Sequence, residues 1–319
     1  MEDAEVLARI HELVIPPAWE DVWICPYPGG HIQATGFDQR GRKQYLYHLR
    51  WRQRRDREKF DEMIAFARVL PRMRERVNAD LGRRGLPEEK VLAAAVRLMD
   101  RGFFRIGSED YAVTNETYGL ATMRKNHVRL VDDDTLVFAY PAKHGKRQVR
   151  SVVDAEVAEV IGTLKRRRGG GNELLAYKKS GGWEDIRSPR INAYLKEATG
   201  IDVSAKDFRT WGATVLAAVA LAVAAPFVQG RTARKRASTR AVKEVAGYLG
   251  NTPAVARSSY IDPRVFERFA DGLTIGPALD ALGEDVDATA IQGPAELAVI
   301  DLLTDGRESD LIEQVSKAA

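Results

Sequence analysis

Tyr260 lies in the segment GNTPAVARSSYIDP, where a phenol could act as a nucleophile if cations surround it. Taken alone, such a tyrosine is more often packed against a helix end. A phenol with a pKa of about 10 is only about 0.1% ionised at neutral pH, so it needs positively charged neighbours to react. Arginine suits phosphoryl transfer because its fork donates two parallel hydrogen bonds to phosphate oxygens and keeps its charge. A lysine can protonate the leaving alkoxide.

The sequence lacks the usual signatures of metal, nucleotide and serine chemistry. It contains no GxxxxGK[ST] loop, no GxGxxG motif after a strand, and no GxSxG motif. Its five histidines show no metal-ligand spacing, and they are His11, His31, His48, His127 and His144. We therefore expect no metal, no cofactor and no small-molecule substrate.

Charge is distributed unevenly along the 319 residues. The chain has 49 Lys and Arg against 45 Asp and Glu, yet from Glu267 onward three basic residues face twelve acidic ones. The preceding part is therefore strongly basic. This asymmetry is typical of a polyanion-binding body with an acidic C-terminal portion. An arginine-rich composition spread over solvated faces is the alternative.

Composition also indicates a cellular compartment. The single cysteine, Cys25, excludes an internal disulfide and favours a reducing environment. The acidic, amphipathic N-terminus does not resemble a secretory signal. The longest apolar run, residues 214–225, is shorter than the ~20 residues that span a bilayer. These features predict a cytoplasmic protein that does not enter a membrane.

Hydrophobic patterns predict two domains in an α+β fold. Residues 1–84 form a small β-rich domain and residues 85–319 a larger, mainly helical one, divided at the turn that contains Pro87. The strands expected in the small domain are residues 22–27, 31–37 and 44–49. The larger domain holds a three-stranded sheet within residues 127–153 and a mostly buried helix over residues 205–225.

Five sequence blocks, in order, resemble the type IB DNA topoisomerases of bacteria and poxviruses. The small domain resembles their DNA-clamping domain, and four later blocks resemble the segments that carry their catalytic residues. The blocks are IPPAWEDVWICPYPGGHIQATGFDQRGRKQYLYH (15–48), MDRGFFRIGSEDYAVTNETYGLATMRKNHV (99–128), FAYPAKHGK (138–146), KDFRTW (206–211) and GYLGNTPAVARSSYI (247–261). The resemblance implies a small β-rich domain and a helical catalytic domain of the tyrosine recombinase and topoisomerase IB type.

The resemblance also implies a role for particular residues. Arg105 and Arg209 would clamp the scissile phosphate, and Asn251 would donate a hydrogen bond to a non-bridging oxygen. Tyr260 would be the nucleophile that forms a 3′-phosphotyrosyl link. Lys143 would protonate the leaving 5′ oxygen, with Lys146 in the same turn as the alternative. Lys206, one helical turn before Arg209, would assist at the phosphate.

The segment RGRKQYLY (40–47) brings basic and aromatic side chains to one predicted strand. Alternation places Arg42 and Gln44 on one face, where they suit base edges, and Tyr45 and Tyr47 on the other, where they suit phosphates or sugars. The resemblance places all four at DNA-contacting positions. An amphipathic edge strand with solvated charges is the alternative.

The resemblance implies a bacterial, cytoplasmic, nucleoid-associated monomer that clamps double-stranded DNA. It would nick one strand, let the free end rotate and reseal the strand, without ATP or a metal ion. A tyrosine recombinase is the nearest alternative, but recombinases carry an H-x-x-R pattern where this chain has KDFR. A catalytically inert DNA-binding module is the alternative from another class.

Overall fold

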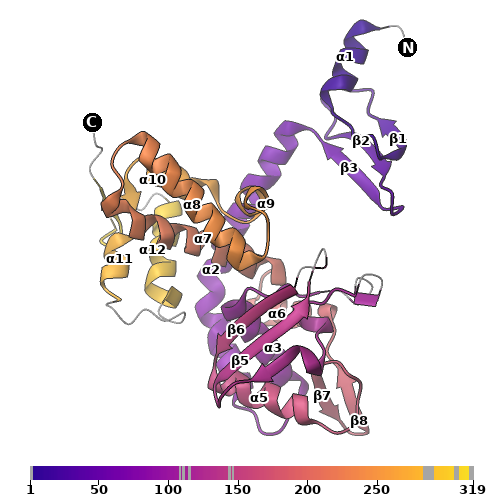
Figure 1. Cartoon of the computed structure of the whole chain (residues 1–319), viewed down its shortest axis with the longest axis vertical. Coiled ribbons are helices and arrows are strands. Elements are labelled where there is room, and N and C mark those ends of the chain that lie inside the picture. The colour runs from indigo at the N-terminus through magenta and orange to yellow at the C-terminus, as the bar shows by residue number, and fades with distance from the viewer. Residues whose placement is uncertain are drawn as a thin grey trace. The chain divides into compact units, whose positions relative to one another are not determined.

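The computed structural model describes residues 3–107, 109, 112–113, 116–142, 145, 147–282, 291–304 and 309–315. Helices and small antiparallel sheets form two compact units, residues 1–62 and residues 63–319 (Figure 1). The mixture of helix and strand expected from the sequence is confirmed.

The division between the units falls inside helix α2 (Leu49–Leu81), earlier than the predicted boundary at residues 84 and 85. The reason is that the second half of this helix is part of the larger unit's core. Met63, Phe66 and Leu70 are all buried, and the Phe66 ring lies edge-on to Phe208 at 5.0 Å. The turn after Leu81 therefore ends a helix without separating two cores.

The smaller unit is built on one three-stranded antiparallel sheet. Its elements are α1 (Ala4–Glu12), β1 (Glu20–Ile24), β2 (Ile32–Phe37), β3 (Lys43–Tyr47) and the first part of α2. Buried Gln33 holds the β1–β2 turn, because its Nε2 donates to the carbonyls of Gly30 at 2.6 Å and Pro28 at 3.0 Å. Arg9 on α1 donates to the Gln33 Oε1 at 3.1 Å. The three strands predicted here are confirmed, with bounds shifted by a few residues.

Over its described residues the larger unit is mainly helical and carries three small sheets. Its longer elements are α3 (Glu88–Gly102), β5 (Thr135–Pro141), β6 (Arg147–Val153), α5 (Ala155–Arg166), α6 (Ser188–Thr199), α7 (Ala205–Ala224), α8 (Arg231–Leu249), α9 (Pro253–Ser259), α10 (Pro263–Ala270) and α12 (Glu296–Leu303). Its shorter elements are η1 (Leu120–Thr122), η2 (Lys125–His127), β4 (Val128–Leu130), β7 (Ala176–Lys179), β8 (Gly182–Asp185), η4 (Ala225–Phe227), β9 (Leu273–Thr274), α11 (Gly276–Asp280), η5 (Ile291–Ala295) and β10 (Glu313–Gln314).

The sheet β4–β5–β6 confirms the prediction for residues 127–153, and helices α3 and α5 pack against it. Strands β5 and β6 pair along their whole length, with Phe138 opposite Arg150 and Tyr140 opposite Gln148. Because side chains alternate along a strand, these four residues share one face of the hairpin. Of the turn that joins the strands, the structure describes Ala142 and Gly145.

Two further strand pairs were not predicted. The β7–β8 and β9–β10 pairs have strands of only two to four residues, so neither offers enough positions for alternation to stand out.

Helix α7 runs through the core of the larger unit as predicted. With η4 it forms the one span, among the described residues, that is long and apolar enough to cross a membrane, and 56% of its most apolar window is buried inside the protein. A core helix meets the same criteria of length and composition.

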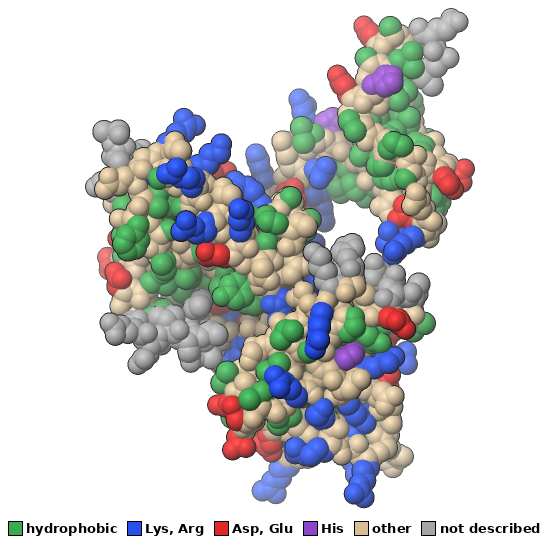
Figure 2. All heavy atoms as spheres, viewed as in Figure 1, with side chains coloured by type: hydrophobic (Ala, Val, Ile, Leu, Met, Phe, Trp, Pro, Cys, Tyr) green, Lys and Arg blue, Asp and Glu red, His purple; other side chains and the backbone are tan. Residues whose placement is uncertain are grey.

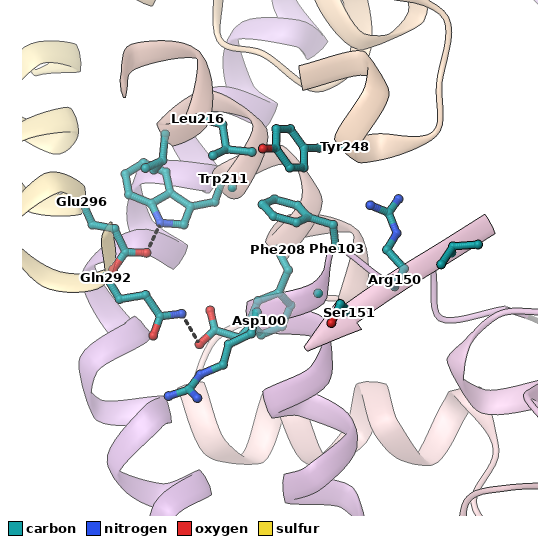
Figure 3. Close-up of a pocket in the computed structure, with 15 residues that line it drawn as sticks. Asp100, Phe103, Arg150, Ser151, Phe208, Trp211, Leu216, Tyr248, Gln292 and Glu296 are labelled. Atoms are coloured by element: carbon teal, nitrogen blue, oxygen red, sulfur yellow. Dashed lines mark hydrogen bonds between the residues drawn. The ribbon is translucent and has the colours of Figure 1, made fainter. Parts of the chain in front are cut away.

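A buried ionic network connects the acidic C-terminal portion to the rest of the unit. The Arg74 guanidinium on α2 pairs with Asp100 on α3 at 2.8 Å and with Glu296 on α12 at 2.6 Å. The Trp211 indole on α7 donates to Glu296 at 2.8 Å, and Gln292 donates to Asp100 at 3.1 Å (Figure 3). The network therefore braces α7, which carries Arg209, against three other helices.

Replacing Arg74 should destabilise this unit strongly. The Asp100 side chain is only 6% exposed and that of Glu296 only 13%, so Arg74→Ala leaves two largely buried carboxylates without their cation. Breaking such a pair costs about 3–5 kcal/mol. We expect a loss of that size in the free energy of unfolding measured by urea titration. Lys179→Ala, which removes an exposed pair with Glu184, should change it by less than about 1 kcal/mol. Equal effects of the two changes would contradict a bracing role.

Candidate active site

Tyr260 lies directly after helix α9, and a hydroxyl from α7 anchors its backbone. Thr214 accepts a hydrogen bond from the Asp262 N–H at 3.1 Å, and its hydroxyl lies 3.4 Å from the Tyr260 carbonyl. Thr214 is fully buried, and its hydroxyl also donates to the Thr210 carbonyl at 2.9 Å. The backbone that carries Tyr260 is thus tied to α7. Thr214 was missed from the sequence because it resembles any core threonine.

Arg105 and Asn251 meet in the turn between α8 and α9. The Arg105 Nη2 donates to the Asn251 Oδ1, and it lies 3.4 Å from the Gly250 carbonyl. Gly250 ends α8 with a positive φ of 63°, a conformation that glycine adopts without strain. The Asn251 Nδ2 is buried and has no hydrogen-bond partner among the described residues. Asn251 therefore holds Arg105 with its oxygen and has its amide N–H groups free for another acceptor.

Arg209 is buried at the centre of this group, with a side chain only 4% exposed. Its guanidinium donates to the carbonyls of Phe103 at 2.5 Å and Leu249 at 2.9 Å, and its Nε has no partner within the described part of the chain. The guanidinium carbon lies 5.2 Å from the centre of the Tyr260 ring. Burial, together with the charge of Arg105, lowers the pKa of Arg209 to about 10, so it is still a cation at neutral pH.

The same charges act on the phenol. Burial alone would raise the pKa of Tyr260, but the positive charges of Arg209 and Arg105, together with a hydrogen bond from Arg209, outweigh it, and the pKa lies below its usual value. A lower pKa increases the fraction of phenolate at neutral pH, and phenolate is the form in which a tyrosine side chain can act as a nucleophile. The structure thus brings together four of the five predicted catalytic residues: Arg105, Arg209, Asn251 and Tyr260.

Comparison with known proteins identifies the family of this chain. The family model described as the catalytic core of eukaryotic DNA topoisomerase I matches residues 48–274. The model of the N-terminal domain of bacterial DNA topoisomerase IB matches residues 1–38. The chain belongs to the type IB DNA topoisomerase family. Its relatives include DNA topoisomerase 1B of Acanthamoeba polyphaga mimivirus, 29% identical over 80% of this chain and 77% of that protein. DNA topoisomerase 1B of Vaccinia virus (strain Western Reserve) is 21% identical over 74% of this chain and 72% of that protein.

As a type IB topoisomerase, the protein relaxes supercoiled duplex DNA. It cleaves one strand through a 3′-phosphotyrosyl intermediate, allows the strand to rotate, and religates it without ATP or a metal ion. This family assignment replaces the alternatives of a tyrosine recombinase and of an inert DNA-binding module. Among the described residues, no group of three His, Cys, Asp or Glu side chains could hold a metal ion.

The predicted type IB site also includes two lysines, Lys143 and Lys206. Lys143 and its alternative Lys146 lie outside the described residues. Lys206 is exposed in the first turn of α7, and its carbonyl lies 3.4 Å from the Thr210 hydroxyl. It therefore shares a helix with Arg209, one turn earlier, and its ammonium is open to solvent.

The four residues predicted to contact DNA in the smaller unit fall into two pairs around β3. Asp38 accepts hydrogen bonds from Arg42 at 2.7 Å and from Gln44 at 2.9 Å. Hydrogen bonds from Arg42 lower the pKa of Asp38 to about 2, so it is ionised at neutral pH. Tyr45 and Tyr47 stack at 6.0 Å on the other face. The alternation expected for this strand is confirmed, and Asp38 is the orienting residue that the sequence did not reveal.

Proposed function

We propose that Tyr260, Arg105, Arg209, Asn251 and Lys143 carry out the strand cleavage of this topoisomerase. The Tyr260 phenol loses its proton to solvent, its oxygen attacks the scissile phosphorus, and the bond from phosphorus to the 5′ oxygen breaks. Lys143 gives a proton to the departing 5′ oxygen. Religation reverses the step: the 5′ hydroxyl returns its proton to Lys143, attacks the phosphotyrosine and releases Tyr260. Because the phosphotyrosyl ester conserves the bond energy, no ATP is consumed.

Unpartnered donors around the phenol are the observation that best supports this proposal. The Arg209 Nε and the Asn251 Nδ2 are buried without hydrogen-bond partners in the described chain, beside a tyrosine with a lowered pKa. A buried donor without an acceptor costs about 1–3 kcal/mol. A phosphate bound next to Tyr260 would supply acceptors for both donors and a negative charge for the two arginines.

The role of Lys143 can be tested with a leaving group that needs no proton. Lys143→Ala should slow single-turnover cleavage of an ordinary duplex by about 10²–10⁴-fold, the usual contribution of a general acid. With sulfur in place of the scissile 5′ oxygen, the leaving thiolate is stable without protonation. We therefore expect Lys143→Ala to cleave this duplex at close to the wild-type rate.

Lys146→Ala is the matched control, because it removes the other lysine of the same turn. It should cleave both duplexes like the wild type. The assignment would be reversed if Lys146→Ala were the slow variant and sulfur restored its rate. A loss at Lys143 that sulfur does not restore would mean that Lys143 acts on binding and does not donate the proton.

A basic region on α8 is a further candidate for binding the duplex. Lysine and arginine side chains gather over α8 (Figure 2), where a groove is lined at helical spacing by Thr232, Lys235, Arg236, Thr239, Arg240 and Lys243. The lysines and arginines of this groove would bind the DNA backbone, so the affinity for DNA would fall steeply as the salt concentration rises. Further contacts to the backbone and the groove edges would come from Lys206, Arg42, Gln44, Tyr45 and Tyr47. We also propose that the protein works in the cytoplasm as a monomer, with its two units clamping one duplex.

A further inference from the structure

Arg150 is an arginine near the active site that neither the sequence motifs nor the proposed roles include. It lies on β6, and its side chain is half-buried and projects toward the side where Phe103 and Tyr248 lie (Figure 3). Its Nη2 donates to the Gln148 Oε1 at 3.2 Å, while its Nε is buried without a partner among the described residues. Like Arg209, it therefore has a buried donor without an acceptor.

Gln148 connects Arg150 to the turn that holds Asn251. A side chain at Gly250 would place its Cβ only 2.7 Å from the Gln148 Oε1, so the glutamine lies directly against that glycine. The Gly250 carbonyl in turn lies 3.4 Å from the Arg105 Nη2. Burial and the charge of Arg105 lower the pKa of Arg150, and the charge of Arg150 contributes to lowering that of Arg209. Three guanidinium groups are thus close enough to repel one another.

These three arginines differ from the structural arginines of the same unit in what they contact. Arg101 pairs with Asp154 at 2.7 Å, and Arg74 pairs with two carboxylates. In the part of the chain that the structure describes, no carboxylate forms an ion pair with Arg105, Arg150 or Arg209. Their hydrogen bonds run to backbone carbonyls, to amide oxygens and to the phenols of Tyr140 and Tyr260, and none of these groups is a carboxylate. One buried and two half-buried guanidinium groups with no carboxylate partner among the described residues indicate a site for an anion that arrives with the substrate.

We propose that Arg150 is a third phosphate-binding arginine of this active site, contacting a non-bridging oxygen of the DNA backbone at the cleavage site. This inference rests on the proposed function, because the anion is the DNA strand that Tyr260 attacks. Gln148 orients Arg150 toward this phosphate, and the β5–β6 hairpin carries both residues. Arg150 thereby connects strand β6 to the phosphate, and Arg105 and Arg209 are proposed to bind the same phosphate.

The test measures single-turnover cleavage by wild type, Arg150→Ala and Arg150→Lys. Arg150→Ala should be slower by about 10- to 100-fold, since a charge-assisted hydrogen bond contributes about 1.5–3 kcal/mol. Arg150→Lys keeps the charge and should recover part of the rate. Gln148→Ala is the control, because it removes the orienting neighbour without removing a charge. Its cleavage rate should fall by less than that of Arg150→Ala. Wild-type cleavage by Arg150→Ala would overturn the proposal.

A second measurement identifies the phosphate and separates contact from folding. Duplexes carry one neutral methylphosphonate, either at the scissile linkage or at one of its neighbours. At the phosphate that Arg150 contacts, the rate ratio of wild type to Arg150→Ala should fall to about one, while the other positions keep the full ratio. An unchanged ratio at every position would overturn the proposal, because a merely unstable variant behaves in that way. If wild type itself formed no covalent adduct, the proposed function would fail instead.

Discussion

Tyr260→Phe should abolish both DNA relaxation and the covalent protein–DNA adduct. The substitution removes only the phenolic oxygen, so the ring that lies 5.2 Å from the Arg209 guanidinium stays in place. Without that oxygen no phosphotyrosyl bond can form, and the arginines alone cannot cleave the strand. We expect no relaxed topoisomers from supercoiled plasmid in EDTA without ATP, and no adduct after denaturation with detergent, while binding to duplex DNA is retained.

Tyr248→Phe is the matched control for this experiment. Tyr248 is an exposed tyrosine on α8 whose ring lies 6.5 Å from Phe103, close to the site but not assigned to the chemistry. This variant should relax plasmid and form adduct like the wild type. Adduct formation by Tyr260→Phe would show that another side chain is the nucleophile, and the roles proposed for the cluster would then lose their basis.

Arg209→Ala should slow cleavage by about 10²–10³-fold or more and shift its pH dependence. The first effect follows from the loss of a preorganised donor at the phosphate. The second follows from the phenol: Arg209 is the main charge that lowers the pKa of Tyr260, whereas burial raises it. Without Arg209 the pKa rises, less phenolate exists at neutral pH, and the cleavage rate should level off at a higher pH than in the wild type. Single-turnover rates across a pH series measure both effects.

Two further variants separate these causes from damage to the fold. Arg209→Lys keeps a cation near Tyr260, so its pH profile should be close to that of the wild type. A lysine has no planar guanidinium to donate to both the Phe103 and Leu249 carbonyls, so its cleavage rate should stay well below the wild-type rate. Arg84→Ala, at an exposed position after α2, should match the wild type. If Arg209→Ala were slow but its pH profile were unshifted, the charge of Arg209 would not be what lowers the pKa of Tyr260.

The acidic C-terminal portion has a structural role that its sequence does not reveal. Its excess of Asp and Glu offered no clear function, because composition does not reveal which carboxylate faces which cation. In the structure Glu296 is largely buried and paired with Arg74, a residue more than two hundred positions earlier in the chain. The pairing depends on how α2 and α12 pack, and no local pattern encodes it.

The catalytic assignments were predictable to the extent that short motifs carry them. The types and order of Arg105, Arg209, Asn251 and Tyr260 were readable from the sequence blocks, and the structure brings all four together. Arg150 was not, because an arginine on a short strand that also carries Arg147 resembles a solvated side chain. What distinguishes it is the burial of its Nε and its proximity to Arg105, which are properties of the packed unit.

The sequence by itself determined the family, the identity of the candidate nucleophile and the helices and strands that carry the site. Those features depend on residue types and periodicities within short segments, where neighbours along the chain decide the outcome. Only the tertiary structure decided which donors lack acceptors, which way the pKa of Tyr260 moves, and which arginines gather without carboxylates. Those properties arise from burial and from distances between segments far apart in the chain, since desolvation and Coulomb interactions act through space and not along the sequence.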